Sequence, residues 1–224
     1  MSLFKDLLNL WRAKDLLHQA WSESIEMLEL SRDIFKEAII QLREHSNRET
    51  LIELKSRDKA INEYHRTVRR KVLTHYSVNQ DTSDFNNGLI LVNMVVDIER
   101  IGDYAKNILE LAMYHPNKII SEEISPELYK IEDAVSHRFD STLEAIKEQD
   151  PELAQNLKES YKVEISALSD DIVNKILANE IHFDNESRAA AIALYARYLK
   201  RIGSHLKNIT SVLVNPFDSI GYME

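Results

Sequence analysis

Two acidic residues near the middle of the chain have the side chains and the spacing that a metal site requires. Glu99 and Asp103 are four residues apart in VNMVVDIERIGDYAKNILEL, the segment 92–111. Residues four apart lie on one side of a helix, so both carboxylates should border the same surface. Asp58 and Asn62 repeat this spacing on an earlier helical segment, and they would face the first pair if the two helices pack antiparallel. Carboxylate and amide oxygens bind hard cations, so these four residues form a candidate metal site.

A network of ion pairs is the simpler interpretation of the same residues. Carboxylates on a helix often face solvent or pair with neighbouring cations, and Arg57 and Lys106 are placed to do so. The sequence holds few other signs of chemistry. None of its eight histidines has Glu three residues before it, and it contains neither a Walker motif nor a Gly-x-Ser-x-Gly motif. We therefore expect no catalytic centre.

The helix that holds Glu99 and Asp103 must also supply part of a core. Nine small or apolar residues fall in one arc of a helical wheel, which predicts a buried stripe with the two carboxylates at its edge. They are Leu91, Met94, Val95, Ile98, Ile101, Gly102, Ala105, Leu109 and Ala112. Gly102 costs a helix about 1 kcal/mol relative to Ala, so it predicts that another backbone approaches closely there.

The composition predicts an all-α protein. Of the 224 residues, 44% are hydrophobic, enough for a sizeable core, whereas 4 Gly and 4 Pro are too few for turn-rich sheets. The absence of Cys excludes disulfides, thiolate metal sites and cysteine nucleophiles. A net charge of −9 argues against general nucleic-acid binding. No apolar run reaches the length of about 18 residues that a membrane span needs, so we expect a cytoplasmic protein.

Helical periodicity predicts six principal helices and a short amphipathic segment before them. The segment carries Leu3, Phe4, Leu7, Leu8 and Trp11, and its mixed charges favour packing on the body or on a partner over lying on a membrane. The helices are predicted at about Asp15–Arg43, Arg48–Tyr76, from the loop Ser77–Ser83 to Pro116, Pro126–Glu148, Pro151–Ala178 and Asn185–Leu213. Asp150 followed by Pro151 is a strong start signal, a cap residue and then a first-turn proline.

A repeat divides the six helices into two units. The segment 98–108, IERIGDYAKNI, matches 199–209, LKRIGSHLKNI, at six of eleven positions with an offset of 199 − 98 = 101 residues. A repeat of this length predicts two similar three-helix bundles in tandem. Pro116 and Pro126 bracket the only stretch with the punctuation of a linker, which places the boundary near Asn117. The predicted units are 1–116 and 117–224.

Two surfaces could contact other molecules. The stretch Leu89–Val96 is apolar on nearly every side, so either the second unit or a dimer partner should cover it, and we expect a homodimer. Four basic residues, Arg66, Arg69, Arg70 and Lys71, gather near the end of the second helix. A solvated helix end is the simpler interpretation of this cluster, and an anion site is the alternative.

The ERIGD-x-A-x-N-I pattern, its second copy and the chain length together resemble the PhoU family of bacterial phosphate-signalling regulators. The resemblance implies a regulator of phosphate uptake and phosphate-starvation signalling that acts by protein–protein contacts. It implies as partners the ATPase of the high-affinity phosphate transporter and a sensor histidine kinase. One alternative keeps the fold and changes the partner to a sodium/phosphate symporter or another transporter. A second alternative, of a different class, is a metal-dependent phosphate-ester hydrolase that uses Glu99 and Asp103.

The resemblance also implies where a metal would bind. PhoU-like proteins hold iron, zinc or similar ions with E(D)xxxD motifs on the second and third helices of each unit. Glu99 and Asp103 match the motif of the third helix, and Asp58 matches that of the second. Asn62 stands in place of the second carboxylate, which should weaken binding because an amide oxygen carries no charge.

The second unit lacks these carboxylates. Shifting Glu99 and Asp103 by 101 residues leads to Lys200 and Ser204. On the second helix, setting Ile61 against Ile165, an offset of 104, places Lys162 and Ser166 opposite Asp58 and Asn62. A cation at these four positions would meet two ammonium groups and no carboxylate. We therefore expect at most one divalent or iron site per chain, on the first unit.

Overall fold

The computed structural model describes residues 16–44, 48–79, 83–115, 119 and 124–221, and these residues contain helices and no strand. The predicted amphipathic segment around Leu3 and Trp11 and the predicted boundary near Asn117 lie outside them. The first unit consists of α2 (Leu16–Glu44), α3 (Arg48–Ser56), α4 (Asp58–Val78) and α5 (Phe85–Tyr114). The second consists of α6 (Ser125–Glu148), α7 (Pro151–Tyr161), a π-helical turn η1 (Lys162–Ser166), α8 (Ala167–Leu177) and α9 (Glu186–Ser211), followed by a 3-10 turn η2 (Phe217–Ser219). No helix among the described residues is both long enough and apolar enough to cross a membrane.

The second helix of each unit is interrupted, where the periodicity predicts an unbroken helix. In the first unit, the Arg57 amide donates to the Leu54 carbonyl, three residues back, at 3.1 Å, and this tight turn separates α3 from α4. In the second, the Ala167 amide donates five residues back to Lys162, which makes the π turn η1. Buried Arg138 of α6 lies against this turn, since it donates to Ser160 at 2.9 Å and to Glu164 at 3.0 Å.

Side-chain caps fix where two helices of the second unit begin. Asp150 Oδ1 accepts hydrogen bonds from the amides of Glu152 at 2.9 Å and Leu153 at 3.0 Å, which confirms the predicted start of α7. At the start of α9, the Asn185 side chain accepts from the Arg188 amide at 2.8 Å. Each cap satisfies amides that have no partner within the helix.

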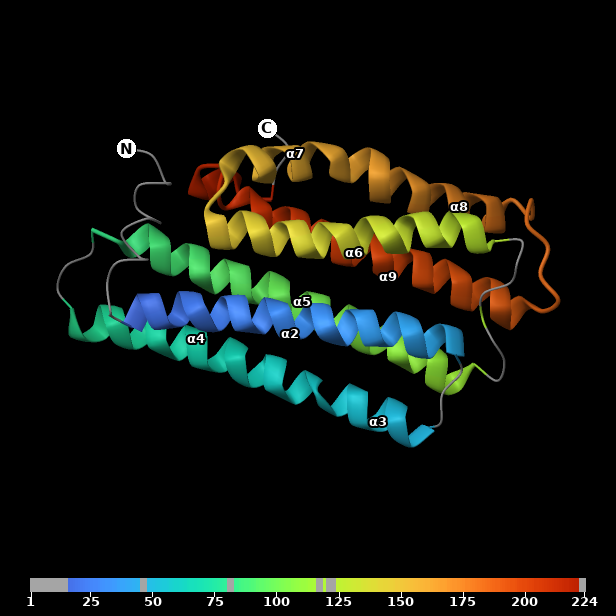
Figure 1. Ribbon diagram of the computed structural model, residues 1–224, viewed down its shortest axis with the longest axis horizontal. Coiled ribbons are helices and arrows are strands. Elements are labelled where there is room, and N and C mark those ends of the chain that lie inside the picture. The colour runs from blue at the N-terminus through green and yellow to red at the C-terminus, as the bar shows by residue number, and fades with distance from the viewer. Residues whose placement is uncertain (1–15, 45–47, 80–82, 116–118, 120–123, 222–224) are drawn as a thin grey trace.

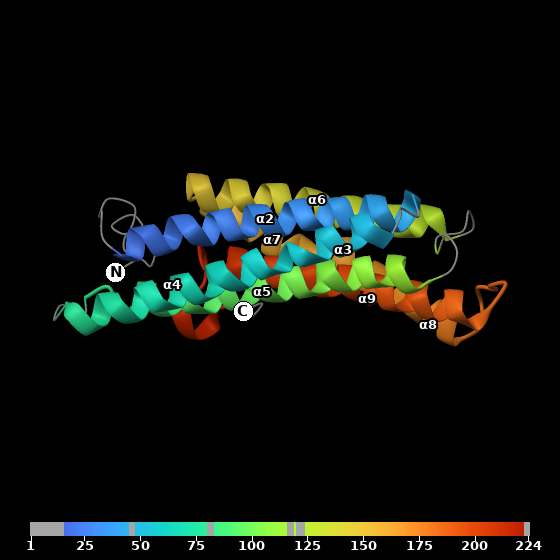
Figure 2. The same ribbon diagram turned by 90° about the horizontal axis from the view of Figure 1, so that it is seen from below.

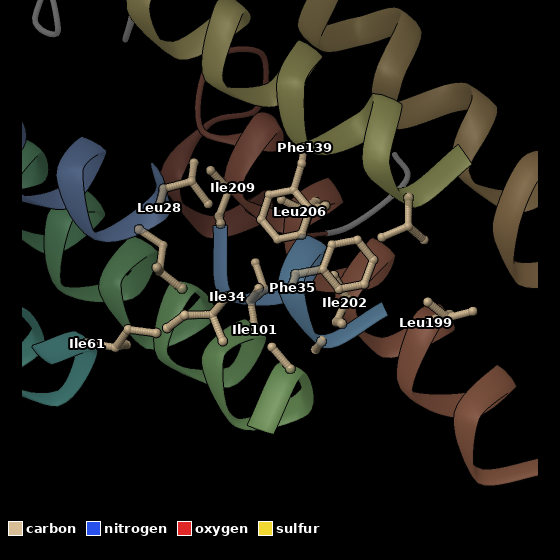
Figure 3. Close-up of a cluster of buried hydrophobic side chains, with 14 of the residues drawn as sticks. Leu28, Ile34, Phe35, Ile61, Ile101, Phe139, Leu199, Ile202, Leu206 and Ile209 are labelled. Carbon is tan, nitrogen blue, oxygen red and sulfur yellow. The ribbon is translucent and has the colours of Figure 1, made fainter. Parts of the chain in front are cut away.

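The two units are three-helix bundles that lie side by side with their long axes nearly parallel (Figure 1). Contacts between the units run along α5 and α9 and along α2 and α6, and the view from below shows the same arrangement (Figure 2). Phe35 of α2 and Phe139 of α6 are fully buried between the bundles, with ring centroids 5.2 Å apart. Their side chains lie near Ile202 and Leu206 of α9 (Figure 3), so one hydrophobic core continues from the first unit into the second.

The apolar stretch Leu89–Val96 of α5 is covered largely from within the chain. α5 packs on α2 and α4 of its own unit and on α9 of the other. Ile90, Leu91 and Val95 are fully buried, while Val96 keeps 39% of its surface exposed. The second unit thus covers most of the apolar stretch that the sequence predicts to be buried. The homodimer stays a prediction, and this surface is no longer its main support.

Equivalent contacts in the two units confirm both alignment offsets. A Cβ added to Gly102 would lie 2.7 Å from Ile61 Cδ1, and one added to Gly203 would lie 2.9 Å from Ile165 Cδ1. Each glycine therefore admits an isoleucine from the second helix of its unit. The predicted close approach at Gly102 is confirmed, but the group that approaches is a side chain and not a backbone. The Ile61 side chain fills the space that a Cβ on Gly102 would take.

Candidate functional site

The four residues of the candidate metal site lie on two helices that pack against each other. Asp58 and Asn62 are in the first turns of α4, and Glu99 and Asp103 are in the middle of α5. Asp58 Oδ1 would be 3.8 Å from a Cβ on Gly102, so the glycine lets this carboxylate lie close above α5. The structure thus confirms that Asp58 and Asn62 face Glu99 and Asp103.

A lysine, however, lies between the carboxylates. Lys106 Nζ is 2.8 Å from Asp103 Oδ1 and 3.3 Å from Asp58 Oδ2, and it thereby joins α5 to α4. Asn62 Nδ2 donates to the same Asp58 oxygen at 3.0 Å. Burial would lower the pKa of Lys106, but its hydrogen bond to Asp103 and the charge of Asp58 raise that pKa above its ordinary value. Lys106 is therefore a fully charged partner of both carboxylates.

Glu99 stands apart from this bridge. Its Oε2 is 3.7 Å from Arg100 Nε, beyond hydrogen-bonding distance. Burial raises the pKa of Glu99, the charges of Asp103 and Asp58 raise it further, and Arg100 and Lys106 oppose the change. Within the described ranges, no three acidic or histidine side chains are arranged to hold a metal ion. The four residues thus share one surface, but as the structure stands Lys106 occupies the oxygens that a metal would need.

The sequence model of the PhoU domain matches this chain twice, over residues 25–112 and 128–213. The chain belongs to the PhoU family. The first PhoU domain runs from within α2 to near the end of α5, and the second runs from early in α6 to just past α9.

Individual relatives agree with this assignment. The phosphate-specific transport system accessory protein PhoU homolog of Zymomonas mobilis is 27% identical over 172 residues, which cover 75% of this chain and 71% of that protein. The fold matches the crystal structure of PhoU from Pseudomonas aeruginosa with a TM-score of 0.77 and 22% identity, over 89% of this chain and 95% of that one. It also matches the phosphate transport system regulatory protein PhoU of Streptococcus pneumoniae, with a TM-score of 0.72 and 17% identity over 88% and 93%. At these identities, the structures show a shared PhoU fold.

The second PhoU domain has a different bridge between its second and third helices. Lys200, at the position of Glu99, lies with its Nζ 2.5 Å from Asp170 Oδ2 of α8. Arg197 donates to the other oxygen of Asp170 at 2.8 Å. Each PhoU domain thus joins these helices by a lysine and an aspartate. The sequence repeat does not reveal Asp170, because its carboxylate comes from a position with no counterpart in the candidate site.

The sequence pattern also did not predict a buried ion pair that lies between the two PhoU domains. Arg43, at the end of α2, contacts Glu132 of α6, and Tyr195 of α9 donates to the same carboxylate at 2.6 Å. Glu132 is 5% exposed and Tyr195 is fully buried. A signal did exist in the sequence, since Glu132 lies four residues after Leu128 and three before Val135, on the apolar line of α6. A charge on a core line requires a buried partner.

The raised pKa of Glu99 predicts how a substitution changes stability with pH. Its folded pKa exceeds the ordinary value of 4.5, so its ionisation destabilises the fold as pH rises above about 4.5, and the whole cost is present at neutral pH. Glu99→Gln should therefore be more stable than the wild type at pH 7, by less than about 1 kcal/mol, and equal to it below pH 4.5.

Urea unfolding at pH 4 and pH 7 measures this difference, with Asp103→Asn as the matched control. Asp103→Asn removes a partner of Lys106, so it should lower stability at pH 7. If Glu99→Gln is the less stable protein at pH 7, the Glu99 carboxylate makes a net favourable ion pair in the folded state and the prediction is wrong.

Proposed function

We propose that this PhoU-family chain is an accessory regulator of a phosphate transport system and that it acts through protein–protein contacts on the cytoplasmic side. The two PhoU-domain matches, which together span both bundles, carry the proposal. The name of the Zymomonas mobilis relative, an accessory protein of phosphate-specific transport, supports the same function for this chain. The contacts of Asp58 and Asp103 support an ion-pair bridge between helices better than a hydrolytic centre.

The outer side of α4 is the surface that we propose for the contact. Arg66, Arg69, Arg70 and Leu73 are exposed there and recur at the three- and four-residue spacing of one helix face, which we call the basic face. Arg69 and Arg70 have no carboxylate partner among the described residues, and Arg66 lies no closer than 4.0 Å to Glu63. Leu73 is 70% exposed, so an apolar side chain adjoins the three guanidinium groups.

The surroundings of two neighbouring residues, Lys71 and His65, distinguish the basic face from an ordinary charged helix end. Lys71, the next residue in the chain, turns to α2 and lies 2.7 Å from Glu23. The pKa of His65 is lowered by burial and then by the positive charges of Arg69, Arg100 and Arg66. The face is therefore a local field of positive charge on a protein whose net charge is −9.

Such a face fits an acidic protein surface, and the partner that we propose is an acidic surface of the transporter ATPase. Arginine is enriched at the energetic centres of interfaces, and an adjoining exposed leucine supplies apolar area. Complementary charge raises the rate of association and favours one partner over others. A sensor histidine kinase or a symporter could present the same chemistry, and the capture experiment distinguishes them.

Charge reversal on the basic face is expected to abolish capture of the ATPase. Arg69→Glu with Arg70→Glu changes the charge by −4 at positions that are exposed, so the fold should remain intact. We expect the amount of transporter ATPase that co-purifies from native membranes at physiological salt to fall at least about ten-fold. Mass spectrometry of the captured proteins and circular dichroism of the variant provide the measurements.

The matched control is Lys130→Glu with Lys162→Glu, the same charge change on exposed residues of the second PhoU domain. This control should capture as much ATPase as the wild type. Equal capture by the basic-face variant would remove α4 as the contact surface. Capture of a kinase or a symporter in place of the ATPase would reassign the partner.

A further inference from the structure

We propose that the groove between α5 and α9 binds an amphipathic helix of a partner protein, and that this helix presents a bulky apolar side chain and, two turns along, a carboxylate. α5 is the last helix of the first PhoU domain and α9 the last α-helix of the second, and the two run side by side in opposite directions (Figure 1). The site therefore belongs to neither domain alone. It lies apart from the basic face, which is on α4, so the proposal does not depend on the contact with the ATPase.

A cavity opens between the end of α5 and the beginning of α9. Its volume is about 360 Å³, within the range of roughly 300–1,000 Å³ that is usual for binding pockets. The apolar side chains that line it come from both helices: Leu111, Tyr114, Ala190, Ala191, Leu194 and Tyr198. Tyr114 is 70% exposed and Leu194 is 45% exposed, although both are large apolar residues. An open cavity with an apolar rim of this kind suits a bulky apolar side chain of a partner.

The shape of the groove fits a helix. Ala190 and Ala191 have small side chains, so the backbone of an added helix can approach α9 closely there. From Ser187, at one end of the cavity, to Arg201 the groove follows α9 for 201 − 187 = 14 residues, about 21 Å or four helical turns. A peptide strand has no sheet edge to join, because the described residues contain no strand. The partner segment is therefore a helix of about four turns.

Arg201 marks the other end of the groove. Its side chain is exposed, and its Nε donates to the Tyr104 hydroxyl at 3.1 Å. The centroid of the Tyr104 ring is 5.8 Å from that of Tyr198, which lines the cavity, so the aromatic pair joins the cavity to the arginine. Tyrosine and arginine are among the residues most enriched at the energetic centres of interfaces. The cavity, the aromatic pair and the arginine thus form one continuous surface.

The charge of Arg201 requires a partner from outside the chain. No carboxylate among the described residues pairs with it, and the hydroxyl to which it donates is neutral. By contrast, Arg197, one turn earlier, donates to Asp170 at 2.8 Å. Glu110, at the cavity, is also paired, since it lies 2.6 Å from Lys55. The unmatched charge of the groove is therefore positive, and it favours a partner that supplies a carboxylate.

The positions of the cavity and of this charge set the spacing on the partner helix. Arg201 is seven residues beyond Leu194, which is on the rim of the cavity, and seven residues are two turns or about 10.5 Å along α9. The carboxylate of the partner should therefore lie seven residues from the apolar side chain, on the same face of its helix.

Selection from a library of helical peptides displayed on phage tests the proposal. One face of the helix is randomised, and the peptides are selected on the full wild-type chain and counter-selected on Ala190→Trp, which fills the cavity from an exposed position. The enriched peptides should carry a bulky apolar residue with Asp or Glu seven positions away. Synthesised singly, they should bind the wild type at least about ten-fold more tightly than Ala190→Trp.

Arg201→Gln tests the charge. Replacement of the peptide's carboxylate by an amide should weaken binding to the wild type and leave binding to Arg201→Gln unchanged, which is the signature of a direct pair in a double-mutant cycle. Arg197→Gln is the matched control for the charge, because that arginine already has a partner, and Ala178→Trp is the control for the added ring. Both controls, and Arg69→Glu with Arg70→Glu, should bind the peptides as the wild type does.

Leu194→Lys covers the case in which Ala190→Trp fails to fold, and it should lose binding to the same extent. Enriched peptides that lack a carboxylate, or that bind the wild type and both cavity variants equally, would overturn the proposal. The absence of any enrichment over the counter-selection would overturn it as well. Light scattering gives the remaining outcome: a wild-type dimer that Ala190→Trp converts to a monomer would assign the groove to a second copy of this chain and not to a partner helix.

Discussion

Replacement of Arg43 by Met is expected to lower the free energy of unfolding by about 3–5 kcal/mol at pH 7. The arginine is the cationic partner of Glu132, whose side chain is only 6% exposed. Removal of one member of a buried ion pair leaves the other charge without compensation in a medium of low polarity. Tyr195 would still donate to Glu132 at 2.6 Å, but one neutral donor cannot replace a guanidinium group.

The loss of unfolding free energy in Arg43→Met should become smaller as pH falls. Burial raises the pKa of Glu132 while Tyr195 and Arg43 lower it, so removal of Arg43 raises that pKa further. The folded variant then takes up a proton that the unfolded chain does not hold, and its deficit should shrink as pH falls toward the ordinary carboxyl pKa of 4.5. Denaturant unfolding from pH 4.5 to pH 8 measures both the size and the slope.

Lys36→Met is the matched control because it breaks a contact between the same two helices at the surface. Lys36 Nζ is 3.0 Å from Asp140, and the two side chains are 43% and 50% exposed. An exposed pair of this kind contributes at most about 1 kcal/mol. A deficit for Arg43→Met no larger than that of the control would show that water reaches Glu132.

Replacement of Phe139 by Ala should cost about 3–5 kcal/mol, since it leaves a cavity in a core that both PhoU domains share. Phe139 is fully buried and contacts Phe35 across the domain boundary (Figure 3). Because the cavity lies between the bundles, we expect the two domains to be destabilised together. Scanning calorimetry should show a single transition at a lower temperature in the variant.

A double-mutant cycle of Phe139→Ala and Phe35→Ala measures the interaction energy between the two rings. The two substitutions should be non-additive by about 0.5–1.5 kcal/mol, the coupling of an aromatic pair beyond its buried area. Leu177→Ala is the control, because that side chain is 79% exposed and its loss should change stability by less than about 0.5 kcal/mol. Two separate transitions, with only the second domain affected, would mean that the core is not shared.

Local chemistry in the sequence was enough to predict the six principal helices, but not the interruption of the second helix in each unit. Apolar side chains at helical spacing defined which face each helix buries, and Asp150 with Pro151 marked a helix start that the hydrogen bonds confirm. The two alignment offsets equate Ile61 with Ile165 and Gly102 with Gly203, and the structure shows the same isoleucine–glycine contact in both units. The spacing of four residues in each pair, together with the packing of α4 against α5, brings Asp58 to face Glu99.

Only the tertiary structure decided which polar groups meet. The sequence offers both Arg57 and Lys106 as possible partners of the carboxylates, and in the structure Lys106 is the one that contacts Asp58 and Asp103. Arg43 and Glu132 are 89 residues apart, and Glu132 and Tyr195 are 63 apart. Helical periodicity reports which face of a helix is buried and carries no information on which distant helix covers it. Contacts between the bundles depend on how two preformed units dock, so the buried ion pair and the shared core emerge only when both units are in place.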